Sequence, residues 1–347
     1  MTPIAYQRII AEIGLSHEGS LGQAHSFIDS ASRAGADIVK FQIHLPELES
    51  SRSENFRVEF STQDSSRTNY WERTAFTLEQ YYELRQHAGN LGLNFCVSVF
   101  SGGAVEWAKE IGADIIKIGS GDIGNEEIIE SLNDYTGELI ISSGMSTWNE
   151  INHAVAVVKE HLKLVNNLTL LQCTSLYPTP LSKVGINVMK RMKETFSDLS
   201  VGLSDHTPGI NSSIVALVYG AEIIEKHVTY SRDMFGPDIK SSITFDELKT
   251  LSIFRNELVE ILLEVDKDSV AQELTKERNI FGRSLGLKRN LPAGHQIVLD
   301  DFCLRKPAGG LNWEDRKQIL GQKLKCPYQV DQLLTPEHID IVKDYKL

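Results

Sequence analysis

The sequence lacks the features that define several protein classes. Its 347 residues include only four cysteines, none of them in a CxxC pair, so neither a zinc ribbon nor a dense disulfide framework is indicated. No apolar run approaches the roughly 18 residues that cross a bilayer. The N-terminus, MTPIAYQRIIAEIG, has no basic segment followed by a long apolar one. We therefore expect a cytoplasmic protein that does not act at a membrane.

Positive charge is also scarce. The chain has 35 Lys and Arg residues against 47 Asp and Glu, a formal net charge of −12. This sign disfavours nucleic acid as a partner, and any anionic ligand must be held by a local cluster of donors. Hydrophobic residues make up 41% of the chain and charged residues 24%, so a large core can form and disorder is not expected.

The sequence does contain a series of short apolar runs, rich in β-branched residues and separated by longer amphipathic stretches. We predict buried strands at residues 8–14, 36–44, 93–101, 113–122, 138–145, 168–175, 199–206 and 221–229. Strands that alternate with helices eight times predict an α/β fold, the closed (β/α)8 TIM barrel. An open doubly wound sheet is the alternative, but no GxGxxG motif follows the first predicted strand.

Polar residues gather toward the C-terminal ends of these predicted strands, where TIM-barrel enzymes carry their chemistry. They are Glu12, Lys40, Gln42, Ser98, Lys117, Ser120, Ser142, Ser175, Ser204, His206 and His227. Side chains two residues apart on a strand share a face, so Lys40, Gln42 and His44 can point together.

Two of these residues, Lys40 and Lys117, lie within apolar strands, where an unpaired charge is costly to bury. Together with the serine hydroxyls, they indicate a pocket for a phosphate or carboxylate. The alternative is that each lysine pairs with a carboxylate of the barrel, such as Glu12, Glu225 or Asp122.

The two histidines end neighbouring predicted strands, the seventh and the eighth. His206 and His227 can therefore be close in space although 21 positions separate them in the sequence. Two neutral imidazoles with open coordination positions suit Mn, Fe, Co, Ni or Zn. A histidine at the end of a strand can equally be a hydrogen-bonded structural residue.

Nine segments occur in order across most of the predicted barrel: AEIGLSHEG, IVKFQIH, YWERTAFT, KIGSGD, ISSGM, QCTSLYPTP, GLSDHTPG, EKHVT and FGPDIKSS. Together they resemble the sialic acid (N-acetylneuraminate) synthase family. The resemblance implies a metal-dependent condensation of phosphoenolpyruvate with N-acetylmannosamine or a related N-acetylated aldose. The products would be a nine-carbon 2-keto-3-deoxy sugar acid and phosphate. The alternatives are a phosphoenolpyruvate-aldose synthase with an eight- or seven-carbon product, and a non-catalytic carbohydrate-binding homologue.

The resemblance also implies roles for individual residues. His206 and His227 would ligate the divalent metal, typically manganese, with magnesium or cobalt as alternatives. Glu12 and Asp238 would be catalytic, near the metal-bound water and the sugar. The substrates would be held by Lys40, Gln42, Ser98, Lys117, Ser120, Ser142, Ser175, Tyr177 and Ser204. Ser175 stands where the family tends to have Asn, and SHEG stands where NHNG is common, so the acceptor sugar stays open.

Beyond the predicted barrel the chain changes character. We expect a barrel over residues 1–265, a polar linker over 266–282 and a small domain over 283–347, in which 291–302 and 328–339 form a weak internal repeat. This tail resembles the antifreeze-like (SAF, β-clip type) domain of the same family, in which it is swapped between the subunits of a homodimer and places an Arg at the sugar. In LRKPAGGL, Lys306 occupies that position beside Arg305, and a solvated basic pair is the alternative. We expect Phe302, Cys303, Trp313 and Cys326 to be core residues of this domain.

Overall fold

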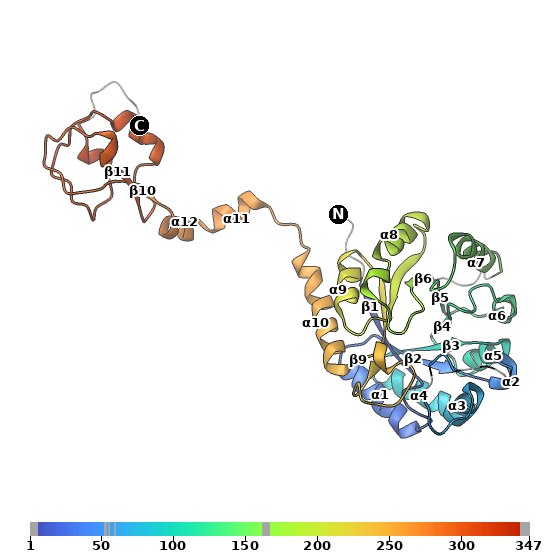
Figure 1. Ribbon diagram of the computed structural model, residues 1–347. Helices are drawn as coiled ribbons and strands as arrows, with labels where there is room; N and C mark the ends of the chain where they lie inside the picture. The colour runs from blue at the N-terminus through green and yellow to red at the C-terminus, as the bar shows by residue number, and fades with distance from the viewer. Residues whose placement is uncertain (1–5, 52–53, 55, 59, 162–166, 341–347) are drawn as a thin grey trace. The chain divides into compact units, whose positions relative to one another are not determined.

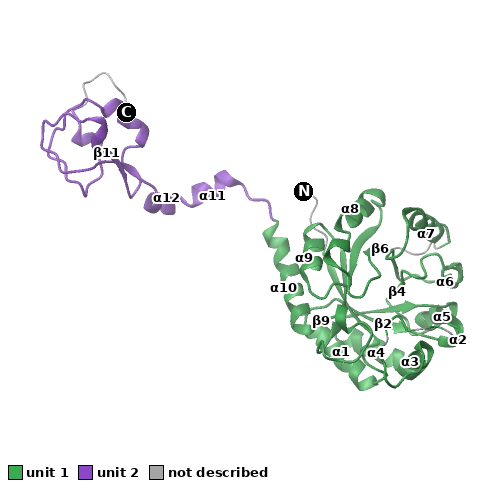
Figure 2. Cartoon of the chain, in the orientation of Figure 1, with its two compact units in different colours: residues 1–262 green, residues 263–347 purple. Residues whose placement is uncertain are grey.

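The structure is a computed structural model that describes residues 6–51, 54, 56–58, 60–161 and 167–340. The chain divides into two compact units, residues 1–262 and residues 263–347 (Figure 2). Within the described residues, no helix is long and apolar enough to cross a membrane.

The first unit is a closed barrel of parallel strands surrounded by helices (Figure 1). Each strand pairs with the next in sequence, and β8 pairs with β1 to close the ring. The strands are β1 (Arg8–Gly14), β2 (Ile38–Ile43), β3 (Asn94–Val99), β4 (Ile115–Ile118), β5 (Glu138–Ser142), β6 (Leu168–Cys173), β7 (Ser200–Asp205) and β8 (Ile223–Thr229). Each strand lies within its predicted range, and the predicted TIM barrel is confirmed.

The outer ring contains the helices that connect these strands. They are α1 (Leu21–Arg33), α2 (Pro46–Glu49), α3 (Arg67–Thr74), α4 (Leu78–Asn90), α5 (Gly102–Glu110), α6 (Glu126–Ser131), α7 (Trp148–His161), α8 (Ile186–Thr195), α9 (Asn211–Val218) and α10 (Phe245–Ile261). Short β9 (Ile243–Thr244) pairs with the end of β8 and leads into α10, whose start is fixed by a capping box of Thr244 and Glu247. Helices α2 and α3 belong to an insertion between β2 and α4, which supplies one wall of the pocket described below.

The interior of the barrel is closed at one end by a small apolar cluster. It consists of Ile10, Ile38, Cys96, Ile115, Ile140, Leu171 and Ile223, all essentially inaccessible to solvent. Because side chains on a strand repeat every two residues, the next inward-facing positions are two residues further along each strand. These positions are Glu12, Lys40, Ser98, Lys117, Ser142, Cys173 and Glu225. A layer of mostly polar side chains therefore lies directly on the apolar layer, at the C-terminal ends of the strands.

The second unit has its own core around a two-stranded sheet of β10 (Ser284–Leu287) and β11 (Phe302–Arg305). The segment expected to be a linker contains two short exposed helices, α11 (Lys267–Glu273) and α12 (Thr275–Phe281), and α13 (Arg316–Ile319) lies further on. The two repeat segments are related: Leu291 bridges Tyr328 at their starts, and each ends at a 3-10 turn.

Of the aromatic and cysteine residues expected in the core of this unit, only Phe302 is buried. Cys303 is partly buried, and the expectation is wrong for Trp313 and Cys326, which are exposed. Trp313 opens a 3-10 turn at the surface, where the Arg316 guanidinium lies 4.5 Å from its ring centroid. Leucine and isoleucine residues make most of this core.

Candidate functional site

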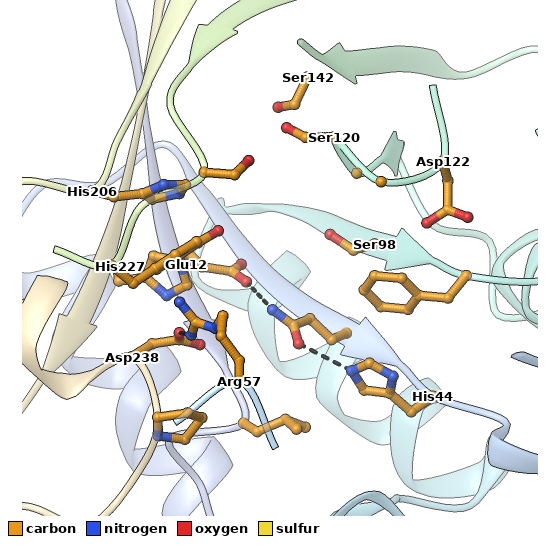
Figure 3. Close-up of a pocket in the computed structure, with 18 of the residues that line it drawn as sticks. Glu12, His44, Arg57, Ser98, Ser120, Asp122, Ser142, His206, His227 and Asp238 are labelled. Atoms are coloured by element: carbon orange, nitrogen blue, oxygen red, sulfur yellow. Dashed lines mark hydrogen bonds and ion pairs between the residues drawn. The ribbon is translucent and has the colours of Figure 1, made fainter. Parts of the chain in front are cut away.

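A cavity of about 580 Å³ opens at the C-terminal ends of the barrel strands (Figure 3). Thirteen of the residues predicted to form a site line it: Glu12, Lys40, Gln42, Ser98, Lys117, Ser120, Ser142, Ser175, Tyr177, Ser204, His206, His227 and Asp238. The other two, Arg305 and Lys306, belong to the second unit. There Arg305 ends β11, and the Lys306 ammonium lies 5.4 Å from the centroid of the Phe281 ring.

The floor of the cavity is a network of buried lysines and carboxylates. Lys40 Nζ lies 3.0 Å from Glu12 Oε2 and 3.5 Å from Glu225 Oε2, while Lys117 Nζ lies 2.5 Å from Glu225 Oε1. The strand register causes this arrangement, since Glu12 is the pairing partner of both Lys40 on β2 and His227 on β8. The sequence favoured a ligand over a barrel carboxylate as the partner of these lysines, and in the structure both lysines pair with carboxylates that line the cavity.

This network favours the charged forms of Lys40 and Glu225. Burial opposes the charge of Lys40, but the carboxylates of Glu12 and Glu225 outweigh it and raise the pKa of the ammonium. Burial likewise opposes ionisation of Glu225, yet the two lysines outweigh it and lower the pKa of that carboxyl. Because two carboxylates already contact the two lysines, an entering anion competes with these carboxylates for the lysines.

Serine hydroxyls line one side of the cavity. Ser120 Oγ accepts a hydrogen bond of 2.9 Å from the Gly144 amide, and Ser142 Oγ is buried with no hydrogen-bond partner among the described residues. A Cβ at Gly144 would lie 2.3 Å from Ser175 Oγ and 2.7 Å from Ser120 Oγ. A glycine is therefore needed for the loops after β4, β5 and β6 to meet here. The free hydroxyl of Ser142 is a donor for a ligand oxygen.

His206 and His227 meet in this cavity with their ring centroids 5.5 Å apart. Burial and the neighbouring His227 both lower the pKa of His206 well below its usual value, so His206 is neutral. His206 Nδ1 lies 3.1 Å from the Thr174 carbonyl oxygen, to which it can donate, and Nε2 then carries the lone pair, 3.4 Å from the Ser204 hydroxyl. This backbone contact is the outer-shell interaction typical of a metal-binding histidine.

The donor set therefore fits a divalent metal held by two protein nitrogens. In the part of the chain that the structure describes, no group of three or more His, Cys, Asp or Glu side chains is arranged to hold a metal ion. The remaining coordination positions would then be filled by oxygens of water or substrate, a mixed set that suits Mn, Fe or Co.

The structure adds residues that the sequence analysis missed. The Arg57 guanidinium lies 2.5 Å from Asp238 Oδ1 (Figure 3). It also lies 3.9 Å from the centroid of the Tyr177 ring, which stacks on His206 at 4.0 Å. Arg57 precedes α3 in the insertion after β2. No periodicity or motif singles it out, because its position depends on how that insertion folds over the barrel.

The buried His17, in the loop after β1, should make the free energy of unfolding depend on pH. It is stacked on Phe76, and burial lowers its pKa from 6.5 to about 3. Between pH 6.5 and 3, His17 binds a proton in the unfolded chain but stays neutral in the folded chain. This difference lowers the free energy of unfolding by about 1.4 kcal/mol for each pH unit in that range. Urea unfolding of His17→Gln between pH 7 and 4.5 should show a shallower decline than the wild type. Equal slopes would contradict this assignment.

Fold and site together define a TIM-barrel protein whose cavity is lined by buried lysines, serine hydroxyls and two histidines at the C-terminal ends of the strands. The NeuB family model matches residues 27–265. The N,N'-diacetyllegionaminic acid synthase of Campylobacter jejuni is 31% identical over 94% of this chain and 98% of its own, and the human N-acetylneuraminate-9-phosphate synthase is 30% identical over 96% and 92%. The crystal structure of the Leptospira borgpetersenii N-acetylneuraminic acid (sialic acid) synthetase in complex with citrate superimposes with a TM-score of 0.65 at 30% identity, covering 78% of this chain and 90% of that one.

The chain belongs to the NeuB family, and it is an enzyme of the sialic acid synthase type.

Proposed function

We propose that this protein condenses phosphoenolpyruvate with an N-acetylated aldose of the N-acetylmannosamine type, releasing phosphate and a nine-carbon 2-keto-3-deoxy sugar acid. The observation that carries this proposal is the single cavity in which two buried lysines and several serine hydroxyls lie next to two paired histidines. The first group suits a small molecule with phosphate and carboxylate groups, and the second suits a metal that would engage an aldehyde oxygen.

Phosphoenolpyruvate binds over the lysine layer in this proposal. Its phosphate and carboxylate would take Lys40 and Lys117 as counter-charges and accept hydrogen bonds from Ser120, Ser142 and Ser204. Glu225 lies in the same layer as both lysines and contacts each of them through a different carboxylate oxygen. The reacting C3 carbon is thereby held at one depth in the barrel, which lowers the entropic cost of reaching the acceptor.

The acceptor sugar lies at the histidine end of the cavity. A divalent metal bound by His206 and His227 would supply Lewis-acid polarisation of the sugar's aldehyde oxygen, so that C3 of phosphoenolpyruvate can attack C1. Water then adds to C2, and loss of phosphate completes the reaction. Glu12 receives the proton of that water, because its carboxylate faces this part of the cavity and is held by Lys40 and by Gln42. Asp238 and Tyr177 line the part of the cavity in which the sugar would lie.

The family resemblance extends this proposal to the second unit. It would act as an antifreeze-like domain that is exchanged between the subunits of a homodimer. Arg305 and Lys306 would then bring positive charge to the sugar bound by the partner. Lysine keeps the charge of the family arginine but lacks its planar pair of donors, which would weaken the grip on an amide or a hydroxyl pair.

Phosphate release tests the proposed reaction directly. The purified protein should release phosphate from phosphoenolpyruvate only when both a divalent metal and one acceptor are present. The acceptors to compare are N-acetylmannosamine, its 6-phosphate and a diacetamido-trideoxyhexose, each with manganese and with EDTA. Turnover with arabinose 5-phosphate or erythrose 4-phosphate instead would replace this proposal with the eight- or seven-carbon synthases. Phosphate release unaffected by EDTA would remove the metal from it.

A further inference from the structure

A chain of polar contacts leads from Glu12 to the wall of the cavity. Gln42 Nε2 lies 2.7 Å from Glu12 Oε1, Gln42 Oε1 lies 3.1 Å from His44 Nε2, and His44 Nδ1 lies 2.6 Å from Glu49 Oε1 (Figure 3). Glu12 and Gln42 lie on β1 and β2, His44 directly follows β2, and Glu49 ends α2. The side chains of His44 and Glu49 are 5% and 3% exposed, so solvent cannot easily replace these contacts.

The donors and acceptors in this chain determine where its protons lie. An ionised Glu12 carboxylate can only accept, so the Gln42 amide must turn its NH₂ group toward it. The amide oxygen then faces His44 Nε2, which must carry a proton to donate. At the other ring nitrogen, the ionised carboxylate of Glu49 also only accepts, so Nδ1 must carry a proton as well. Both ring nitrogens of His44 then face acceptors, an arrangement that the imidazolium form satisfies.

The surroundings of His44 suit such a cation. Its ring lies between Trp71, at a centroid distance of 4.6 Å and an interplanar angle of 13°, and Phe100, at 4.4 Å and 6°. Two aromatic faces stabilise a flat cation by their negative quadrupoles. Glu49 supplies the counter-charge, and its second oxygen, Oε2, has no hydrogen-bond partner among the described residues.

Other charged groups lie near this pair on the neighbouring elements. On the loop after β4, burial first and then the Glu49 carboxylate raise the pKa of Asp122. Burial and then Glu49 raise the pKa of Tyr81 on α4. In the loop after β1, His44 adds to the effect of burial in lowering the pKa of His17. These side chains surround the pair, but none of them contacts His44 in place of Glu49.

We infer that His44 is a positioning residue: as an imidazolium paired with Glu49, it fixes the Gln42 amide, and through that amide it orients the Glu12 carboxylate. A neutral His44 has only one N–H group. If Nε2 lacks the proton, it no longer donates to the Gln42 amide oxygen, and the amide could turn that oxygen toward Glu12. The consequence for Glu12 rests on the proposed function, whereas the protonation of His44 does not.

Nitrogen-15 NMR of labelled histidine tests the protonation by itself. The His44 signals, assigned by their loss in His44→Gln, should show a doubly protonated ring in the wild type at pH 7.5. Glu49→Gln removes the counter-charge and should convert the ring to the neutral form at the same pH. Glu47→Gln removes an exposed carboxylate from the same helix and should leave the ring unchanged. A neutral His44 in the wild type would overturn the inference, even if the protein proves to be a synthase.

Kinetics test the effect on Glu12. Glu49→Gln should lower kcat by about 10- to 100-fold at pH 8, the range seen when a supporting contact behind a functional group is lost. The loss should shrink as the pH falls to 6, because His44 regains its proton, and Glu47→Gln should show neither effect. A loss of the same size at both pH values would indicate a purely structural role and would contradict the inference.

Discussion

His227→Ala and His206→Ala are each expected to lower phosphate release at least about a hundredfold, beyond the 10- to 100-fold cost of losing an outer contact. The reason is the size of the donor set. Among the described residues, no third His, Cys, Asp or Glu side chain is grouped with His206 and His227, so each substitution leaves a single nitrogen for the proposed metal. Isothermal titration with Mn²⁺ should show the loss of binding independently of activity.

The matched control for this prediction is His153→Ala, which removes an exposed histidine on α7, on the outside of the barrel. It should leave both Mn²⁺ binding and turnover unchanged. Circular dichroism should show that all three variants keep the barrel. A His206→Ala or His227→Ala protein that still binds Mn²⁺ and retains most of its activity would remove these residues from the metal site.

Lys226→Met is expected to lower the free energy of unfolding by about 3–5 kcal/mol. Lys226 Nζ lies 3.3 Å from Asp205 Oδ1 and donates to the Thr207 carbonyl oxygen, and neither charged side chain is exposed. The variant would leave the Asp205 carboxylate buried without its cation. Asp205 and Lys226 are pairing partners on β7 and β8, each next to one of the two histidines. Urea unfolding of the full chain measures the loss.

Two comparisons separate this buried pair from a general effect of removing a lysine. Lys226→Met combined with Asp205→Asn should lose less stability than Lys226→Met alone, because no unpaired charge remains buried. Lys159→Met breaks a surface pair with Asp198, in which the side chains are 43% and 66% exposed, and should leave the stability almost unchanged. If the double variant is as unstable as the sum of its single variants, the pair is not coupled.

The barrel could be predicted from the sequence because its signal is local. Each strand is an apolar run between amphipathic helices, and the eight runs at residues 8–14 through 221–229 each contain an observed strand. The tail was harder to predict. Trp313 and Cys326 were expected in the core because of their residue type, but in a small domain the burial of one side chain depends on turns whose geometry no periodicity reveals.

The residue pattern along the strands is enough to predict which chemical groups reach the mouth of the barrel. A period of two along each strand places a polar residue two positions beyond an apolar one, as Lys40 follows Ile38 and Lys117 follows Ile115. The order of the strands also determined that His206 and His227 are neighbours. These conclusions follow from the geometry of any closed parallel barrel, before side-chain contacts are known.

How these polar side chains pair with one another could not be predicted from the sequence and depends on the tertiary structure. Glu225 pairs with both lysines, Arg57 covers the Tyr177 ring, and His44 reaches Glu12 through Gln42. Such contacts join residues that are far apart in the chain or lie in irregular segments, and their choice depends on distances of a few ångströms. The sequence sets the direction of a side chain on a strand, but the strand register and the folding of the insertion after β2 set which atoms meet.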